Sequence, residues 1–299
     1  MDKGMSRRMR GNLLLLLTAA IWGFAFVAQK AGGKELGPLT FNGVRSFLGG
    51  GLLLVLLPLL DRLGLAQSPA TRQEKKTLWL GGLLCGLALF LATNLQQLGV
   101  LTTTTGKAGF ITSLYIVLVP VFGLIIRRKT TLFHWLGVAL AVVGLYLLCM
   151  QGSAGIGQGD LLVMACAPML ALQILLVDRF APRVDGVRLS CIQFFTVGVL
   201  NLPLMFCFET PSLTAMTACW DSVLYAGLIS SGVAYTLQIV AQKETHPTTA
   251  SVLMSLESVF AVLSGMLFLG DRMTPRESAG CLVMFGAVLL AQLPQKKGR

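Results

Sequence analysis

Two ionisable residues, Glu257 and Arg45, lie inside long apolar segments of the sequence. A charge at the centre of a membrane helix costs about 2.5 to 3.5 kcal/mol on insertion scales, so each residue needs a partner, water or a function. Glu257 lies about ten residues into its segment, or about 15 Å of helical rise, which is close to a bilayer midplane. Its carboxyl group could bind a cationic group or carry a proton, or it could form a fixed structural contact.

Arg45 lies about seven residues into its own apolar segment. Its guanidinium group could face a cavity and bind a carboxylate or a phosphate, because its planar donors match those groups. Long basic side chains can also extend to the membrane interface, and this alternative stays open for Arg45.

Uncharged polar and aromatic residues recur in other apolar segments and predict a polar interior. Each of them could instead join two helices by a hydrogen bond. Together with Arg45 and Glu257, the candidate binding residues are Trp22, Asn42, Asn94, Tyr115, Gln173, Gln193, Tyr235 and Gln238. An aromatic cavity with few charges suits an amino acid or a related amphipathic metabolite.

Motifs for catalysis, cofactor binding and metal binding are missing from the sequence. It has no H-E-x-x-H or G-x-S-x-G motif. The run Thr102 to Ala108 fails as a phosphate-binding loop, since Leu101 stands where the first glycine is required. The seven cysteines form no C-x-x-C pair, and neither His134 nor His246 has a cysteine or histidine nearby at zinc-ligand spacing. We therefore expect no enzyme activity, no cofactor and no metal site.

The elements that position these residues are predicted from hydropathy. The chain is 55% hydrophobic and 12% charged, with a mean hydropathy of +0.75, which is typical of a protein that folds in lipid. A bilayer core of about 30 Å takes about 20 apolar residues per helix. We predict an all-α polytopic membrane protein of ten transmembrane helices at residues 11–29, 38–60, 77–98, 105–126, 131–150, 159–178, 187–208, 219–240, 247–269 and 275–293.

The first segment follows the basic stretch Met5 to Arg10 and so resembles a secretory signal. Its apolar run from Leu13 to Ala28 is longer than a typical signal core and lacks a clear cleavage site. We expect it to be a retained helix.

Basic residues alternate between the predicted connections, and this bias predicts the orientation. One side would carry eighteen of the 24 lysines and arginines: Lys3, Arg7, Arg8, Arg10, Arg62, Arg72, Lys75, Lys76, Arg127, Arg128, Lys129, Arg179, Arg183, Arg188, Lys243, Lys296, Lys297 and Arg299. The other side would carry Lys30, Lys34, Lys107, Arg272 and Arg276. Both termini are therefore expected in the cytoplasm, with the protein in the cytoplasmic (inner) membrane. The net charge of +11 is explained without nucleic-acid binding.

The second half of the sequence weakly repeats the first. Gly11-Asn-Leu-Leu14 matches Gly159-Asp-Leu-Leu162 at an offset of 148, and Leu95-Gln96 matches Leu237-Gln238 at an offset of 142. Each half, 1–150 and 151–299, would hold five helices, so the second must enter the membrane from the opposite side. Such inverted repeats are typical of transporters. Chance matches between leucine-rich segments are the alternative.

Several motifs together resemble a known family. They are Gly11-Asn12, Ala20-Ile-Trp-Gly23, Arg45, Ala108-Gly-Phe-Ile-Thr-Ser113, Leu256-Glu257, Leu269-Gly-Asp271, Gly280 and Gly286, and in order and spacing they resemble an EamA-type permease of the drug/metabolite transporter superfamily. The resemblance implies ten helices around a central cavity and transport of small metabolites, often as export. Ser258 stands where many members have a proline after the glutamate, which removes the usual cause of a helix kink there.

These observations favour a secondary transporter that exports small organic metabolites, such as amino acids, by alternating access. A membrane-embedded enzyme and a passive channel are the alternatives. Facilitated diffusion, proton antiport and solute exchange all stay open, and Glu257 is the candidate for any proton coupling. We expect its partners to be a small-molecule solute and the lipid bilayer, and the protein to be a monomer.

Overall fold

The structure is a computed structural model of the chain, and it describes residues 2–103, 105–127, 130–149, 156–269 and 274–291. Some residues used in the sequence analysis lie outside this part. They are Gly270 and Asp271 of the family motif and the basic residues Arg128, Lys129, Arg272, Lys296, Lys297 and Arg299.

The described residues form helices and connections, and contain no strand. The first half contains α1 (Asp2–Leu36), α2 (Pro38–Arg62), α3 (Arg72–Thr102), α4 (Thr105–Ser113), α5 (Tyr115–Ile125) and α6 (Leu132–Cys149). The second half contains α7 (Gln158–Phe180), η1 (Ala181–Arg183), α8 (Gly186–Phe208), α9 (Leu213–Ala218), α10 (Trp220–Leu224), η2 (Tyr225–Ala234), α11 (Tyr235–Gln242), α12 (Pro247–Met254), α13 (Glu257–Leu269) and α14 (Pro275–Ala291).

Helix starts follow local capping chemistry. Thr71 and Glu74 form a capping box at the start of α3, in which each side chain accepts from the other residue's backbone N–H. Proline is the first residue of α2 and of α12, where its fixed φ fits the first turn and no N–H is needed. The starts of these helices therefore follow from sequence.

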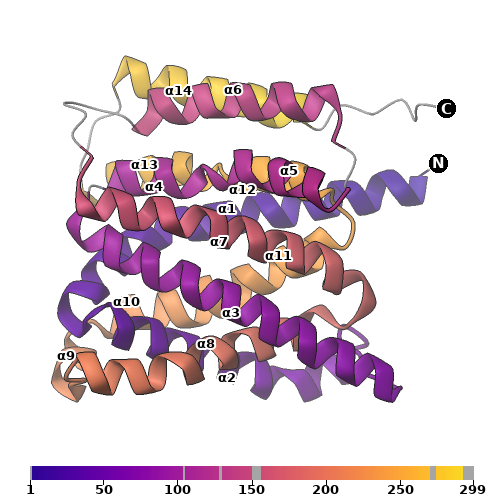
Figure 1. Cartoon of the computed structure of the whole chain (residues 1–299), viewed down its shortest axis with the longest axis vertical. Helices are drawn as coiled ribbons and strands as arrows, with labels where there is room; N and C mark the ends of the chain where they lie inside the picture. The colour runs from indigo at the N-terminus through magenta and orange to yellow at the C-terminus, as the bar shows by residue number, and fades with distance from the viewer. Residues whose placement is uncertain (1, 104, 128–129, 150–155, 270–273, 292–299) are drawn as a thin grey trace.

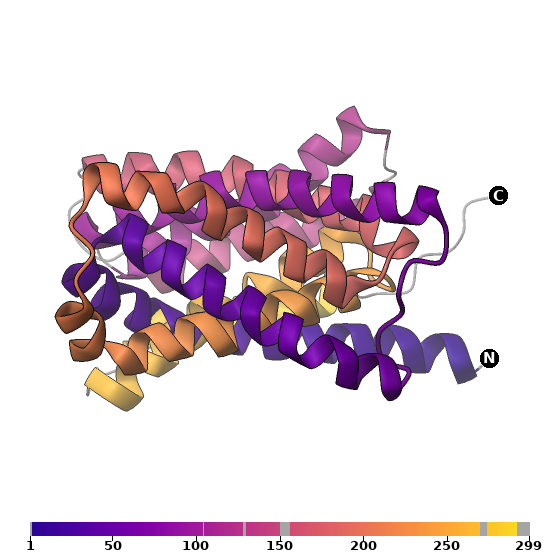
Figure 2. The same ribbon diagram turned by 90° about the horizontal axis from the view of Figure 1, so that it is seen from below.

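The helices lie roughly side by side in one bundle (Figure 1). Helix α6 packs against α14 at one edge, and α2 packs against α8 near the opposite edge, with α1 and α7 between them. Figure 2, turned by 90°, shows α3, α7 and α8 along one face of the bundle and α1 along another. The interior between these layers holds the polar residues of the candidate site.

The outer surface is apolar, as lipid requires. Val55, Ile125 and Leu282 are each about three-quarters exposed, and exposed apolar surface on this scale marks a membrane or partner contact. Eight segments of the described chain are long and apolar enough to cross a membrane, and Leu132–Leu147 of α6 forms a shorter apolar helix. The prediction of an all-α polytopic membrane protein is confirmed in this coarse form.

Two of the predicted spans are interrupted helices. The span 105–126 divides into α4 and α5 at Leu114, and the span 247–269 divides into α12 and α13 at Ser255 and Leu256. The backbone tightens at both places, where the Leu114 N–H donates to the Ile111 carbonyl and the Leu256 N–H donates to the Leu253 carbonyl. These i to i−3 bonds replace the α-helical i to i−4 pattern.

No proline causes the second interruption, since Ser258 follows Glu257. Serine hydroxyls bond back to the helix instead: Ser251 Oγ donates to the Thr248 carbonyl at 2.9 Å and Ser255 Oγ donates to the Val252 carbonyl at 2.8 Å. Such bonds compete with the helical ladder and bend helices. A third irregular segment, the π-helical η2, lies between α10 and α11.

Candidate functional site

A small cavity of about 30 Å³ lies among helices from both halves of the chain. Its walls come from α1, α2, α3, α4, α5, α7, η2, α11 and α13. The lining residues are Trp22, Phe26, Gln29, Arg45, Gln96, Thr112, Tyr115, Leu170, Gln173, Ile174, Ser230, Tyr235, Gln238 and Glu257. The lining combines apolar and aromatic side chains with polar groups, and small-molecule sites use such polar groups to fix the orientation of the ligand.

Glu257 is placed in this cavity by the interruption between α12 and α13. As the first residue of α13, it is 5% exposed. Its Oε1 accepts from the Tyr115 hydroxyl at 3.3 Å and from Ser113 Oγ at 3.5 Å. Tyr115 is likewise the first residue of α5, so both helix interruptions direct a polar residue to the same place.

Arg45 reaches the same cavity from α2 and is 4% exposed. Its guanidinium carbon lies 5.7 Å from the centre of the Phe41 ring, which is a cation–π distance. Within the described residues it makes no hydrogen bond or ion pair, including none with Glu257. The structure thus buries the Arg45 side chain at the cavity, in contrast to the alternative in which this side chain extends to the membrane interface.

Aromatic rings form one wall of the cavity. The rings of Trp22 and Tyr235 lie 4.5 Å apart between centroids, and Phe194 packs edge-on against Tyr235 at 5.3 Å. The indole N–H of Trp22 donates to the Ser230 carbonyl at 3.4 Å, within the π-helical segment η2. The widened turns of η2 thus help to hold the aromatic wall, and π-helical insertions are frequent at functional sites.

Four glutamines form a hydrogen-bonded ladder behind this wall. Gln173 donates to Gln193 at 3.1 Å, and Gln238 donates both to Gln173 at 3.2 Å and to Gln242 at 3.2 Å. Gln242 in turn donates to the Ile174 carbonyl at 3.4 Å. All four are buried, so the ladder orients Gln173 and Gln238, the two members that line the cavity.

Seven of the ten predicted site residues line the cavity, and three do not. Asn42 and Asn94 bond to each other at 2.9 Å between α2 and α3, and Asn42 also donates to the Thr93 carbonyl at 3.0 Å. Gln193 supports Gln173 from behind. These three residues have the interhelical role that the sequence analysis left open as the alternative.

Half of the lining was not in the predicted set. The additional residues are Phe26, Gln29, Gln96, Thr112, Leu170, Ile174 and Ser230. The sequence does single out Gln96, because it matches Gln238 in the internal repeat. In the structure the Gln96 amide donates to the Thr112 hydroxyl at 3.2 Å. The apolar residues carry no signal that separates them from ordinary helix packing.

The two histidines lie together, away from the cavity lining. The rings of His134 and His246 are stacked, with 4.7 Å between centroids, and His134 Nε2 lies 3.1 Å from Thr249 Oγ1. In the part of the chain that the structure describes, no group of three histidine, cysteine or acidic residues could hold a metal ion. The stacked pair therefore belongs to helix packing between α6 and α12.

Comparisons with known proteins agree over nearly the whole chain. Residues 9–150 and 157–293 each match the EamA-like transporter family. A protein of Archaeoglobus fulgidus described as an uncharacterized transporter is 30% identical over 293 residues, covering 96% of this chain and 87% of its own length. The uncharacterized transporter YoaV of Bacillus subtilis is 24% identical, covering 90% of this chain and 92% of its own.

A partial match concerns a protein with a more specific description. The threonine/homoserine exporter RhtA of Escherichia coli is 30% identical over 175 residues, which cover 56% of this chain and 55% of RhtA. One solved crystal structure superposes with a TM-score of 0.76 at 18% identity, covering 95% of this chain and 96% of that chain. At that identity the superposition supports the fold.

Proposed function

The chain belongs to the EamA-like transporter family, and from that premise we propose that it is a secondary transporter that exports small zwitterionic solutes, such as amino acids, across the cytoplasmic membrane. The solute would bind in the cavity between the two halves. Alternating access would then expose the cavity first to one face of the membrane and then to the other.

One observation carries the proposed solute class: the cavity holds one basic and one acidic residue that do not neutralise each other. Arg45 and Glu257 both line it, and neither forms an ion pair within the described residues. Buried charges are costly unless they are paired. A solute with a carboxylate and an ammonium group would supply the missing partner to each, while Trp22 and Tyr235 would contact its side chain.

We further propose that residues 1–150 and 151–299 are inverted five-helix repeats that together make ten transmembrane helices. The internal offsets pair Asn42 with Ser190 and Asn94 with Thr236. Asn42 donates to Asn94 at 2.9 Å, and Thr236 donates to Ser190 at 2.9 Å. Equivalent positions in the two halves thus make equivalent contacts, which chance sequence matches would not produce.

Helix directions support the inversion. The repeat pairs α2 with α8, and these helices are antiparallel neighbours, because the C-terminal Asp61 of α2 contacts Arg188 near the start of α8. It also pairs α6 with α14, where added Cβ atoms at Gly137 and Gly144 would meet Ala291 and Met284, respectively. Equivalent helices that run in opposite directions are what an inverted repeat requires.

The purified protein in proteoliposomes tests the proposed activity. Vesicles loaded with radiolabelled L-threonine or L-homoserine, the solutes in the description of RhtA, and with a panel of other neutral amino acids would be diluted into buffer, and efflux would be followed. We expect saturable efflux of at least one amino acid. Comparing untargeted metabolites of cells that overproduce the protein and cells that lack it would extend the panel.

Paired chemical analogues sharpen this test. An amino acid amide lacks the carboxylate for Arg45, and the N-acetyl derivative lacks the ammonium group for Glu257. Both should compete poorly with the parent amino acid. Flux that never saturates would indicate a channel, and equal competition by all three forms would overturn the zwitterion proposal.

A further inference from the structure

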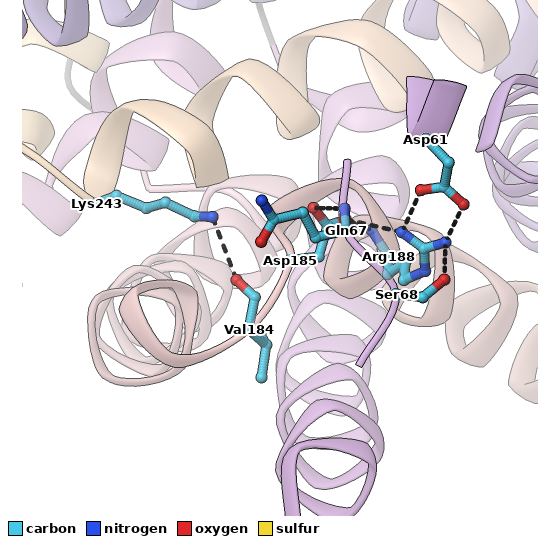
Figure 3. A network of polar contacts seen from close by, with 7 residues as sticks. All are labelled: Asp61, Gln67, Ser68, Val184, Asp185, Arg188 and Lys243. Atoms are coloured by element: carbon cyan, nitrogen blue, oxygen red, sulfur yellow. Dashed lines mark hydrogen bonds and ion pairs between the residues drawn. The ribbon is translucent and has the colours of Figure 1, made fainter. Parts of the chain in front are cut away.

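Carboxylates join α2 and α8 at both of their ends. At one end, Asp61 at the end of α2 accepts two hydrogen bonds from the guanidinium group of Arg188, at 2.9 and 2.6 Å (Figure 3). Arg188 Nη2 also donates to Ser68 at 2.8 Å. We call this contact the Asp61 latch.

At the opposite end, Glu209 follows the last residue of α8 and caps the start of α2. Its two carboxylate oxygens accept from the Leu39 N–H at 2.9 Å and from the Thr40 N–H at 2.7 Å. The Thr40 hydroxyl donates to the same carboxylate at 2.6 Å. A carboxylate at a helix N-terminus also interacts favourably with the helix dipole. We call this contact the Glu209 latch.

The two latches occupy equivalent positions in the proposed repeat. The offset of 148 takes Asp61 to Glu209 and Thr40 to Arg188. Each latch therefore joins the same two positions, at opposite ends of one antiparallel helix pair. Under the axis that relates inverted repeats, the latch at one membrane face becomes the latch at the other.

Between the latches the two helices touch at glycines. An added Cβ at Gly50 would meet the Phe194 and Phe195 side chains, and one at Gly198 would meet the Phe47 ring at 3.0 Å. The Phe47 and Phe195 rings themselves pack edge-on at 6.3 Å. The pair therefore has close contacts in its middle and carboxylate contacts at both ends.

We propose that the Asp61 and Glu209 latches are the two alternating gate contacts of the transporter, each of which opens when α2 and α8 rock apart at its own membrane face. With both latches closed and most of the cavity-lining residues buried, the structure has the contacts expected of an occluded state. This inference rests on the proposed transport function and adds the residues that control access.

The alternative is a static brace, in which both latches stay closed throughout. The two hypotheses predict different changes in access from the two membrane faces when one contact is removed. Loss of one gate contact shifts the equilibrium towards opening at that face and away from opening at the other, because a two-state equilibrium moves by the differential stability of its states. Loss of one contact in a brace loosens the pair without favouring either face.

The rate at which a cavity cysteine is labelled from each membrane face measures this change in access, and the measurement needs no solute. The seven native cysteines would be replaced, and Ser230, a cavity-lining residue, would be changed to cysteine. Right-side-out and inside-out vesicles would then be treated with a membrane-impermeant maleimide. Asp61→Asn should raise the labelling rate from the Arg188 face by about two- to fivefold, the range for an exposed ion pair, and lower it from the other face.

Glu209→Gln should produce the opposite pattern, with about a tenfold change because three hydrogen bonds to a charged group are weakened. Gly37→Ala is a second way to open this latch, since an added Cβ would lie 2.6 Å from the Glu209 carboxyl carbon and Gly37 has φ of +83°. Glu244→Gln and Glu35→Gln are matched controls at the two ends. Both are exposed acids whose side chains make no hydrogen bond or ion pair in the described part of the chain.

The charge exchange Asp61→Arg with Arg188→Asp should return the labelling pattern part of the way to that of the parent protein, because Asp185 lies 3.8 Å from the Arg188 side chain and would repel an aspartate there. Opposite shifts for the two latches support the proposal, and shifts of the same sign or no shift overturn it. If Glu209→Gln and Gly37→Ala both fail to insert, the Asp61 variants and their rescue decide alone. Labelling needs no transported solute, so correct gating shifts without amino acid efflux would overturn only the proposed function.

Discussion

The two halves of the chain place different chemistry at equivalent positions. In the first half, α2 presents Arg45 and α5 presents Tyr115, whereas the matching positions in the second half carry Gln193 and Glu257. Arg45, Tyr115 and Glu257 line the cavity, and Gln193 lies behind it. The scaffold contacts between Asn42 and Asn94 are repeated, but the cavity residues are not. In this protein a duplicated framework therefore encloses an asymmetric site.

The glutamine ladder is a second difference between the halves. Gln173 and Gln242 match Ala25 and Val100 in the first half, which cannot form the same bonds. A polar seam therefore runs along one side of the cavity. A solute bound there meets the glutamine ladder on one side and a different set of polar groups, including Arg45 and Gln96, on the other, which would fix its orientation.

The largest expected effect comes from removing the acidic charge. Glu257→Gln keeps the shape of the side chain and its contact with the Tyr115 hydroxyl, but it loses the charge that would bind an ammonium group or a proton. We expect transport to be abolished or uncoupled from any proton gradient, with about a ten- to hundredfold loss of solute affinity, since a charged hydrogen bond contributes about 1.5 to 3 kcal/mol. Efflux from proteoliposomes at several pH values measures this.

Glu244→Gln is the control for that variant, because Glu244 is an exposed acid in the connection after α11. Membrane insertion of both variants would be compared by their yield after purification. Unchanged solute flux and unchanged pH dependence in Glu257→Gln would contradict the role given to this residue.

The next largest effect should follow from making the two halves alike at Arg45. Arg45→Gln installs the residue that the second half carries at position 193. We expect a loss of affinity of about tenfold or more for a solute with a carboxylate, because one charged partner is lost. The amino acid amide, which has no carboxylate, should bind the variant and the parent protein equally well in competition assays.

Arg45→Lys is the matched control, since it keeps the charge but loses the planar pair of donors. Its affinity should lie between those of the parent protein and Arg45→Gln. An amide that loses as much affinity as the amino acid would show that Arg45 acts through the structure of α2 instead.

A smaller effect is expected at Tyr115, the position equivalent to Glu257. Tyr115→Phe removes the hydroxyl that donates to Glu257 at 3.3 Å and leaves the ring in place. A hydrogen bond of this kind contributes about 1 kcal/mol, so solute affinity should change by about fivefold. If the hydroxyl acts through Glu257, adding Tyr115→Phe to Glu257→Gln should change affinity no further. Additive effects in this double-mutant cycle would contradict that coupling.

The smallest effect belongs to the repeated scaffold contacts. Asn42→Ala and Ser190→Ala each remove one partner of an interhelical pair outside the cavity. Interhelical hydrogen bonds in membranes contribute about 0.6 kcal/mol on average. Both variants should therefore lower the thermal stability of the detergent-solubilised protein slightly and leave the affinity for solute unchanged. A large affinity change in Asn42→Ala would return that residue to the binding site.

Hydropathy was sufficient to place the helices, because each predicted segment overlaps a helix or an interrupted helix of the structure. The interruptions themselves were not predicted. At Ser255 the cause is a set of serine hydroxyls bonded to carbonyls of the preceding turn. Serines are common in membrane helices, so their presence does not indicate where the i to i−4 hydrogen bonds are interrupted. No proline at position 258 marks the interruption in the sequence.

The candidate site was predicted in part, for a physical reason. A polar residue in an apolar segment signals that it avoids lipid, and eight of the ten candidates are buried, while Trp22 and Tyr235 are partly buried. The same signal does not say whether the residue faces a neighbouring helix or a cavity. Asn42 and Asn94 bond to each other away from the cavity lining, whereas Gln173 and Gln238 bond within the ladder and still border the cavity.

The way in which α2 begins affects how the chain is made. At the equivalent position of α8, Asp185 caps its own helix by accepting from the Arg188 N–H at 2.9 Å, but α2 has Gly37 there and no capping side chain. Its capping carboxylate, Glu209, lies 170 residues beyond Leu39. At about 5 to 20 residues per second, a ribosome needs about 10 to 30 s to reach it. During that interval the first turn of α2 lacks its capping carboxylate, so this turn gains its final contacts only after α8 has been synthesised.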